Sequence, residues 1–200
     1  MSKAEQDLFY SDDLNTCSYF RPLVDGEKGC YMSHVQIWRG LLASNDSAWI
    51  VLEDDVIPAP GFADAVNAIA KLPDGWDMVK LIGRERERIL QSWPLDSRFG
   101  LISYRRVPSL TAGYVISRIG ARRLLDTRVP FGRPIDVDLR LWWENGMVIR
   151  GVVPAAIALA ANGGSSSIGA REDRIAVTQR WRKFVFKLRY TVANWCAPTR

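Results

Sequence analysis

The sequence predicts an α/β domain with a mixed, mostly parallel sheet flanked by helices. Short apolar runs rich in β-branched residues have the composition of strands buried on both faces. These runs are 48–52, 77–83, 111–117 and 147–153. The segments between them carry apolar residues at the three- and four-residue spacing of an amphipathic helix, over 27–43, 62–70 and 118–126. Strands that alternate with helices favour a mostly parallel sheet.

The composition is that of one globular domain. Of the 200 residues, 48% are hydrophobic and 24% are charged, which excludes a disordered, collagen-like or coiled-coil chain. The most apolar stretch, 151–161, is too short to span a membrane, and the N-terminus lacks the pattern of a signal peptide. Three widely spaced cysteines, Cys17, Cys30 and Cys196, predict neither a disulfide framework nor a zinc site and fit a reducing, cytoplasmic compartment.

Positive charge is concentrated at the C-terminal end. The formal net charge is +5, of which residues 171–200 carry +6 and the remainder carries −1. This balance argues against nucleic acid as a partner of the body. Two arginine groups in the body, 84–88 and 105–106, could contact phosphates or form a solvated surface. We expect a loose N-terminal segment, 1–22, a central domain, 23–170, and a basic amphipathic tail, 171–200.

The spacing of apolar residues in the tail predicts a helix with one apolar stripe. Five basic residues lie off that stripe, as in helices that lie on an anionic membrane surface. The expected location is therefore peripheral, on the inner face of the cytoplasmic membrane. The alternative is a helix whose aromatic stripe packs on the domain. The stripe consists of Val177, Trp181, Phe184, Val185, Leu188, Val192 and Trp195.

The strongest functional signal is Glu53-Asp54-Asp55, which directly follows the strand predicted over 48–52. Ligand sites in open α/β sheets gather at the carboxyl ends of strands. Side chains alternate along an extended chain, so Glu53 and Asp55 are expected on one side. Two carboxylates there suit a hard divalent cation. The alternative is a turn whose acidic residues cap the next helix.

Other candidate residues are spread along the chain. Asp136 and Asp138 could bind a metal or a sugar hydroxyl, or act as a general base, but Asp136 could also cap a helix. His34, the one histidine, is either a catalytic group or a structural side chain. Gly113 and Tyr114 could bring backbone close to a ligand, or Gly113 could lie beside a bulky neighbour.

Five segments together resemble a known family. They start with Gly26-Glu-Lys-Gly-Cys-Tyr-Met-Ser-His34 and continue with 49–56, 75–81, 111–117 and 134–139. In content, order and spacing they resemble glycosyltransferase family 25. That family includes the lipopolysaccharide and lipooligosaccharide galactosyltransferases of Gram-negative bacteria and the collagen galactosyltransferases. The resemblance extends over about residues 23–168.

The resemblance implies a GT-A-like fold, a nucleotide-sugar donor such as UDP-galactose, a saccharide or glycolipid acceptor, a divalent metal such as manganese, and inversion at the anomeric carbon. A metal bound to the acidic motif would act as a Lewis acid on the departing diphosphate. The residues carried over are Glu53, Asp54 and Asp55 for the metal, Glu53, Gly113 and Tyr114 for the donor, Asp138 or Asp136 as general base, and His34 in an open role.

The chain departs from the family pattern at its start. Family members usually begin with a strand that forms part of the nucleotide pocket, and residues 1–25 contain no such strand. We therefore expect a domain that is shortened at its N-terminus. A transferase for envelope glycolipids is the first hypothesis, and a catalytically silent relative that acts as a binding or scaffold module is the second. A metal-dependent phosphohydrolase is the third, and a single histidine makes its ligand set hard to assemble.

Overall fold

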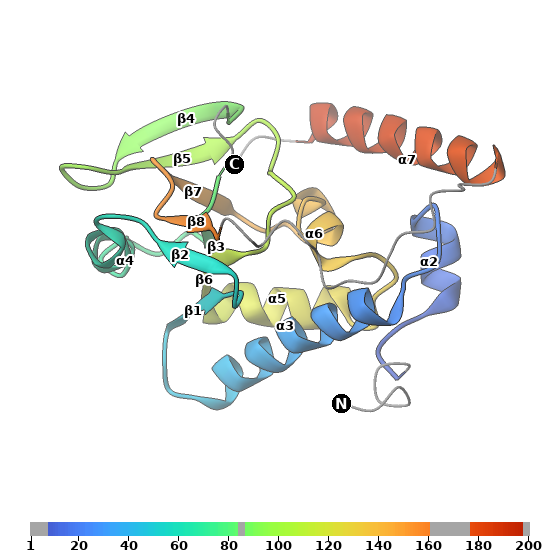
Figure 1. Cartoon of the computed structure of the whole chain (residues 1–200), viewed down its shortest axis with the longest axis horizontal. Coiled ribbons are helices and arrows are strands. Elements are labelled where there is room, and N and C mark those ends of the chain that lie inside the picture. Colours follow the sequence, from blue (N-terminus) through green and yellow to red (C-terminus); the bar gives the residue numbers. More distant parts are fainter. Residues whose placement is uncertain (1–7, 84–86, 161–176, 198–200) are drawn as a thin grey trace.

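The computed structural model describes residues 8–83, 87–160 and 177–197. A six-stranded sheet of order β1-β6-β3-β7-β5-β4 forms its centre, with helices around it (Figure 1). A second sheet pairs two short strands, β2 and β8. The strands are β1 Ala48–Leu52, β2 Val56–Pro58, β3 Met78–Lys80, β4 Ile89–Pro94, β5 Gly100–Tyr104, β6 Gly113–Ser117, β7 Ile149–Val153 and β8 Ile157–Leu159.

The α/β class is confirmed, and the mixed sheet is compatible with a GT-A-like fold. The prediction of a mostly parallel sheet is wrong, because within the described sheet only the pair β3–β7 is parallel. Strands β1, β3 and β7 do run in one direction, as expected. However, β6 lies antiparallel between β1 and β3, and the hairpin β4–β5 adds an antiparallel edge that the sequence did not reveal.

Two predicted helices cover one face of the sheet. Helix α3, Asp25–Ala43, lies beside α5, Arg118–Arg128 (Figure 1). The Glu27 carboxylate stabilises the first turn of α3 by accepting a hydrogen bond from the backbone N–H of Val24 and pairing with Arg21 at 2.6 Å. Helix α4, Phe62–Ile69, packs on the opposite face.

The central strand β6 divides the core into two layers. Its side chains alternate, so Tyr114 and Ile116 pack with the α3 side while Val115 packs with the α4 side. The edge strand β1 differs from the prediction that it is buried on both faces. Ile50 and Leu52 are exposed there, because the described sheet continues only on the β6 side of β1.

The N-terminal segment is more ordered than the sequence predicted. Helix α2, Asp12–Ser18, begins after Ser11, whose hydroxyl accepts from the Leu14 N–H. The buried Asn15 amide donates to the carbonyl oxygens of Arg21 and Gly132 at 2.9 and 2.8 Å. The second acidic motif lies on a short helix, α6, Ile135–Asp138, which is followed by a 3-10 turn, Trp142–Glu144.

The predicted tail helix is present as α7, Val177–Cys196. It packs on the body through Phe186, whose ring meets Tyr19 edge-on at 5.6 Å, and through the buried Tyr190. Arg182 donates to the carbonyl oxygens of Thr16 and Tyr19. The end of the predicted central domain, 161–170, and the first basic residues of the tail lie outside the described residues.

Candidate functional site

The first acidic motif lies at the carboxyl end of β1, as predicted. The Glu53 N–H donates to the carbonyl oxygen of Ala112 at 2.9 Å and extends the β1–β6 pairing by one step. The side chain of Glu53 accepts a hydrogen bond from the Thr111 hydroxyl, also at 2.9 Å. Glu53 is therefore held between the end of β1 and the segment that enters β6.

Helix α3 brings a thiol and an imidazole to the same place. Cys30 and His34 are four residues apart and so lie on one helix face. One donor atom from each of Cys30, His34 and Glu53 lies within 4.8 Å of the others, the one such group among the described residues. Asp54 and Asp55 are not members of that group, so the three acids expected to share a metal do not form one compact donor set.

Two aromatic residues, Tyr114 and Trp38, fix the position of His34. Its Nδ1 lies 2.7 Å from the Tyr114 hydroxyl, which also accepts a hydrogen bond from Trp38 Nε1 at 3.1 Å. The Tyr114 hydroxyl accepts the hydrogen bond from Trp38 with an oxygen lone pair, so it can donate its own proton to His34 Nδ1. This arrangement favours a His34 that carries its proton on Nε2. His34 then presents an N–H donor to its surroundings and not a free lone pair for a metal.

Burial determines the protonation states of His34 and Lys80. It lowers the pKa of His34 to about 4, helped by the positive charge of Lys80, so the ring is neutral at pH 7. Burial also lowers the pKa of Lys80 to about 8. The Lys80 ammonium donates to the carbonyl oxygen of Leu110. The analysis of the sequence overlooked Lys80, although a lysine inside the apolar run Met-Val-Lys-Leu-Ile was an available signal.

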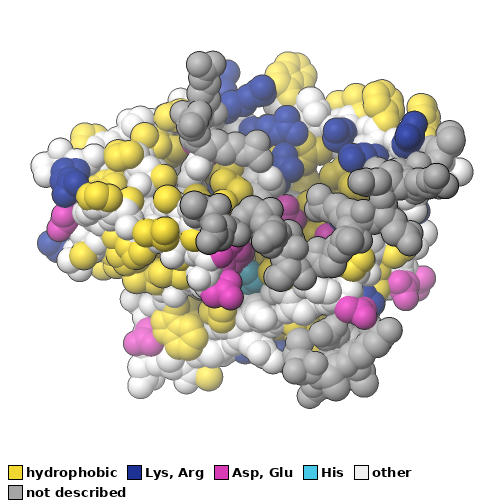
Figure 2. All heavy atoms as spheres, viewed as in Figure 1, with side chains coloured by type: hydrophobic (Ala, Val, Ile, Leu, Met, Phe, Trp, Pro, Cys, Tyr) yellow, Lys and Arg dark blue, Asp and Glu magenta, His cyan; other side chains and the backbone are white. Residues whose placement is uncertain are grey.

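Besides burial, the acidic side chains near Glu53 raise its pKa. Burial raises the pKa of Glu53, the hydrogen bond from Thr111 opposes this, and the charges of Asp55, Asp54 and Asp136 raise it further. Asp55 Oδ1 is buried and has no hydrogen-bond partner among the described residues. Acidic side chains gather beside the histidine in the middle of the face shown in Figure 2. The structure therefore brings Glu53, Asp55 and Asp136 into one negatively charged region.

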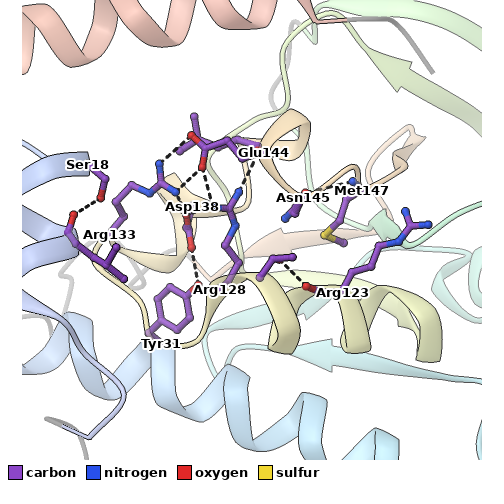
Figure 3. A network of polar contacts seen from close by, with 12 residues as sticks. Ser18, Tyr31, Arg123, Arg128, Arg133, Asp138, Glu144, Asn145 and Met147 are labelled. Atoms are coloured by element: carbon purple, nitrogen blue, oxygen red, sulfur yellow. Dashed lines mark hydrogen bonds and ion pairs between the residues drawn. The ribbon is translucent and has the colours of Figure 1, made fainter.

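Asp138 has a different environment, which favours a structural role over that of a general base. It is 3% exposed. The Tyr31 hydroxyl donates to its Oδ2 at 2.6 Å, and Arg133 pairs with its Oδ1 at 2.8 Å (Figure 3). Arg128 and Arg133 are in turn tied to Glu144, each at 2.7 Å. Burial and two arginines hold the Asp138 carboxylate away from solvent, so its surroundings are those of a structural ion pair.

Gly113 and Tyr114 also have structural roles. A Cβ on Gly113 would lie 2.1 Å from Ile157 Cδ1 and 3.1 Å from Leu52 Cδ2. The close approach is therefore made by side chains of β8 and β1, and the expectation of a backbone contact with the donor is not supported. Tyr114 is fully buried and positions His34, so it is not placed to touch a donor.

Comparison with known proteins places the chain in a family. The model of "Glycosyltransferase family 25 (LPS biosynthesis protein)" matches residues 2–139. A glycosyltransferase 25 family member of Aedes aegypti is 34% identical over 122 residues, which are 59% of this chain and 19% of that protein. The human procollagen galactosyltransferase 2 is 32% identical over 124 residues, again 59% and 19%.

A third relative carries a different name. The "probable inactive glycosyltransferase 25 family member 3" of Bos taurus is 30% identical over 128 residues, which are 59% of this chain and 20% of that protein. The chain thus spans about a fifth of the length of these curated relatives. The family match itself includes α3, the acidic motif after β1, and Asp136. Because that match extends over more than half of the sequence, the chain belongs to glycosyltransferase family 25.

Proposed function

We propose that this chain takes part in transferring a hexose, galactose in the first instance, from a UDP-sugar to a saccharide acceptor of lipopolysaccharide or lipooligosaccharide. The family description names lipopolysaccharide biosynthesis, and the human relative is named as a galactosyltransferase. The observation that carries the proposal is the buried oxygen of Asp55, which has no hydrogen-bond partner among the described residues and lies in the same acidic region as Glu53.

A divalent cation such as manganese fits the carboxylates of this region. A buried carboxylate oxygen without a donor is costly, and hard cations prefer oxygen ligands. Glu53 and Asp55 would hold the ion, with the exposed Asp54 at the rim, while the Cys30 thiol does not suit a hard cation. When bound, the ion supplies Lewis-acid stabilisation of the nucleoside diphosphate that leaves the sugar.

Asp136 is the residue proposed to act as general base. It is half-buried, and its negative charge raises the pKa of Cys30, Glu53 and Lys80, which places it at the acidic region. In an inverting transfer the acceptor hydroxyl forms a bond to the anomeric carbon while the bond to the diphosphate breaks. Asp136 accepts the hydroxyl proton in that step. His34, neutral and held by Tyr114, supplies a hydrogen-bond donor beside it.

Calorimetric titration of UDP, with and without manganese, tests donor binding. We expect binding to depend on the metal in the unaltered chain and to be lost in Asp55→Asn. The matched control is Asp126→Asn, which removes an exposed carboxylate on α5. Equal binding by Asp55→Asn would remove Asp55 from the metal site.

A transfer assay with UDP-galactose and lipooligosaccharide tests the general base. We expect Asp136→Asn to lower kcat by about a hundredfold or more while the affinity for UDP is unchanged. A kcat close to that of the Asp126→Asn control would overturn the assignment of Asp136.

A catalytically silent binding module is the second candidate function. It is favoured by the existence of a relative named as probably inactive. Folded protein that binds no UDP in either titration would favour this second function.

We also propose that α7 attaches the protein to an anionic membrane surface. Five residues of the predicted stripe are exposed: Trp195, which is 85% exposed, and Trp181, Phe184, Leu188 and Val192. Arg180, Lys187 and Arg189 are exposed off that stripe, which provides charge complementarity to acidic lipids. None of the described helices is long and apolar enough to cross a bilayer.

Vesicle co-sedimentation tests this attachment. We expect binding to vesicles of equal parts phosphatidylcholine and phosphatidylglycerol, and weak binding to phosphatidylcholine alone. The double variant Phe184→Ser/Leu188→Ser should bind much less, since both side chains are exposed and their removal leaves the face that packs on the body intact. Undiminished binding by this stripe variant would contradict the proposal.

A further inference from the structure

A cavity of about 330 Å³ lies between α7 and the sheet strands β5 and β7. Ser103 and Tyr104 of β5, Ile149 of β7, and Tyr190 and Asn194 of α7 are among its walls. None of the acidic residues of the candidate catalytic site lines it. The cavity is therefore a separate feature of the fold, formed where the tail helix meets the domain.

Buried polar atoms of this cavity lack partners. Tyr190 is 4% exposed, yet its hydroxyl has no hydrogen-bond partner among the described residues. Asn194 donates its amide to the carbonyl oxygen of Arg105, but its own side-chain oxygen is also unpartnered there. Buried polar groups are nearly always satisfied in native proteins, so these atoms can serve as partners for a polar ligand inside the cavity.

The charge of the walls indicates the sign of that ligand. Arg88, Arg105 and Arg106 line the cavity, and no ion pair joins any of them to a carboxylate within the part of the chain that the structure describes. Arg106 is fixed over the Tyr190 ring at 4.6 Å. Figure 2 shows basic side chains gathered on this part of the molecule. Several guanidinium groups near hydroxyl donors are a typical site for phosphate.

The cavity extends to the exposed apolar stripe of α7. Trp195 both lines it and belongs to the exposed stripe of α7. An anionic group in the cavity could thus be joined to an apolar chain that lies along Trp195 and the stripe. A membrane phospholipid has this combination of a phosphate headgroup and acyl chains, whereas a free phosphate lacks the apolar part.

We propose that this cavity, here named the arginine pocket (Arg88, Ser103, Arg105, Arg106, Tyr190 and Asn194), binds the phosphate headgroup of an anionic membrane lipid. The arginines neutralise the phosphate, and the hydroxyl of Tyr190 donates to one of its oxygens. The inference rests on the proposed attachment of α7 to membranes and adds a specific lipid site to it.

The first experiment measures a single lipid molecule in solution. Calorimetry with dihexanoyl-phosphatidylglycerol below its critical micelle concentration avoids any contribution from a bilayer. We expect Arg105→Glu to weaken its affinity about tenfold or more, and Tyr190→Phe to weaken it less. Arg122→Glu, the same change at an exposed site on α5, should leave the affinity unchanged. Equal affinity in Arg105→Glu and Arg122→Glu would overturn the proposal.

A parallel titration separates the two sources of phosphate. Inorganic phosphate and glycerol phosphate lack acyl chains, so they should bind at least about tenfold more weakly than the short-chain lipid if the stripe contributes. Inorganic phosphate that binds as tightly as the lipid would assign the pocket to free phosphate and overturn the lipid assignment.

Vesicles distinguish failure of the pocket from failure of the stripe. We expect the stripe variant Phe184→Ser/Leu188→Ser to lose vesicle binding while it still binds the short-chain lipid. If Arg105→Glu binds both the vesicles and the short-chain lipid normally, the arginine pocket is refuted and attachment by the stripe stands. If the stripe variant binds vesicles normally and Arg105→Glu does not, the pocket stands and attachment by the stripe is refuted.

Discussion

The two acidic motifs look alike in the sequence and differ in their surroundings. Each places two acidic residues two positions apart, at Glu53 and Asp55 and at Asp136 and Asp138. Both Asp55 and Asp138 have a buried Oδ1 without a hydrogen-bond partner among the described residues. Asp138, however, accepts from a tyrosine hydroxyl and forms ion pairs with two arginines, whereas no ion pair of the described residues involves Asp55. The comparison teaches that the counter-charges around a carboxylate, and not its spacing in the chain, decide whether it is structural or available for binding.

Removing Asp138 should cost the most stability. Asp138→Ala leaves Arg128 and Arg133, both buried, with Glu144 as their remaining carboxylate partner. Breaking a buried ion pair in this way costs about 3–5 kcal/mol of unfolding free energy. Urea denaturation measures it. A loss below about 1 kcal/mol, as is usual for a surface pair, would break the distinction between the two motifs.

Acid should destabilise the protein through His34. The ordinary pKa of 6.5 applies in the unfolded chain, and the folded value is about 4. The unfolded state therefore binds the extra proton between these values, and unfolding free energy falls as pH falls from about 6.5 to 4. The full contribution is about 3 kcal/mol.

The measurement compares the unaltered chain with His34→Gln by urea denaturation across this pH range. Glu53 contributes with the opposite sign, because its folded pKa is raised. The difference between the two proteins isolates the histidine, since the chain has no second one. Parallel stability curves for the two proteins would show that His34 is accessible to protons in the folded state.

Gly113→Ala should cost about 1–3 kcal/mol through overpacking, because the new Cβ meets Ile157 Cδ1. Ile157→Val removes that atom, so the double variant should recover part of the loss in urea denaturation. Recovery would confirm that the glycine beside the acidic region serves packing. If Gly113→Ala is as stable as the unaltered chain but no longer binds UDP, the glycine belongs to the donor site after all.

Asp55→Asn should have the smallest effect on stability, within about 1 kcal/mol, and in the stabilising direction. It removes one of several like charges near Glu53 and breaks no ion pair that the structure shows among its described residues. Urea denaturation without added metal checks this. A loss comparable to that of Asp138→Ala would mean that the two motifs do not differ as described.

Much of the fold follows from local patterns. The periodic apolar residues of 27–43, 62–70 and 118–126 predicted α3, α4 and α5 within a few residues. The hairpin β4–β5 was missed because β4, with its sequence Ile-Leu-Gln-Ser-Trp-Pro, is mostly exposed and lacks a buried apolar face. Strands β2 and β8 have three residues each, too few to show a period.

The candidate site was predicted only where it is local in the sequence. The acidic motif after β1 and the Cys30/His34 block were visible as motifs. The contacts that decide their roles join residues far apart, such as His34 with Tyr114, or Tyr31 with Asp138. No periodicity in a single sequence reports such pairs. The structural roles of Asp138 and Gly113 therefore could not be separated from catalytic ones before the fold was known.

The contact between α2 and α7 has a consequence for the order in which the chain can fold. Arg182 bonds to Thr16 across 166 residues of sequence, and Phe186 packs on Tyr19 and Phe20. During synthesis Tyr19 and Phe20 leave the ribosome long before α7, the helix that packs on them. Such long-range contacts slow folding and leave apolar surface exposed in the meantime. We expect the N-terminal part of the chain to reach its packed state only after α7 has been made.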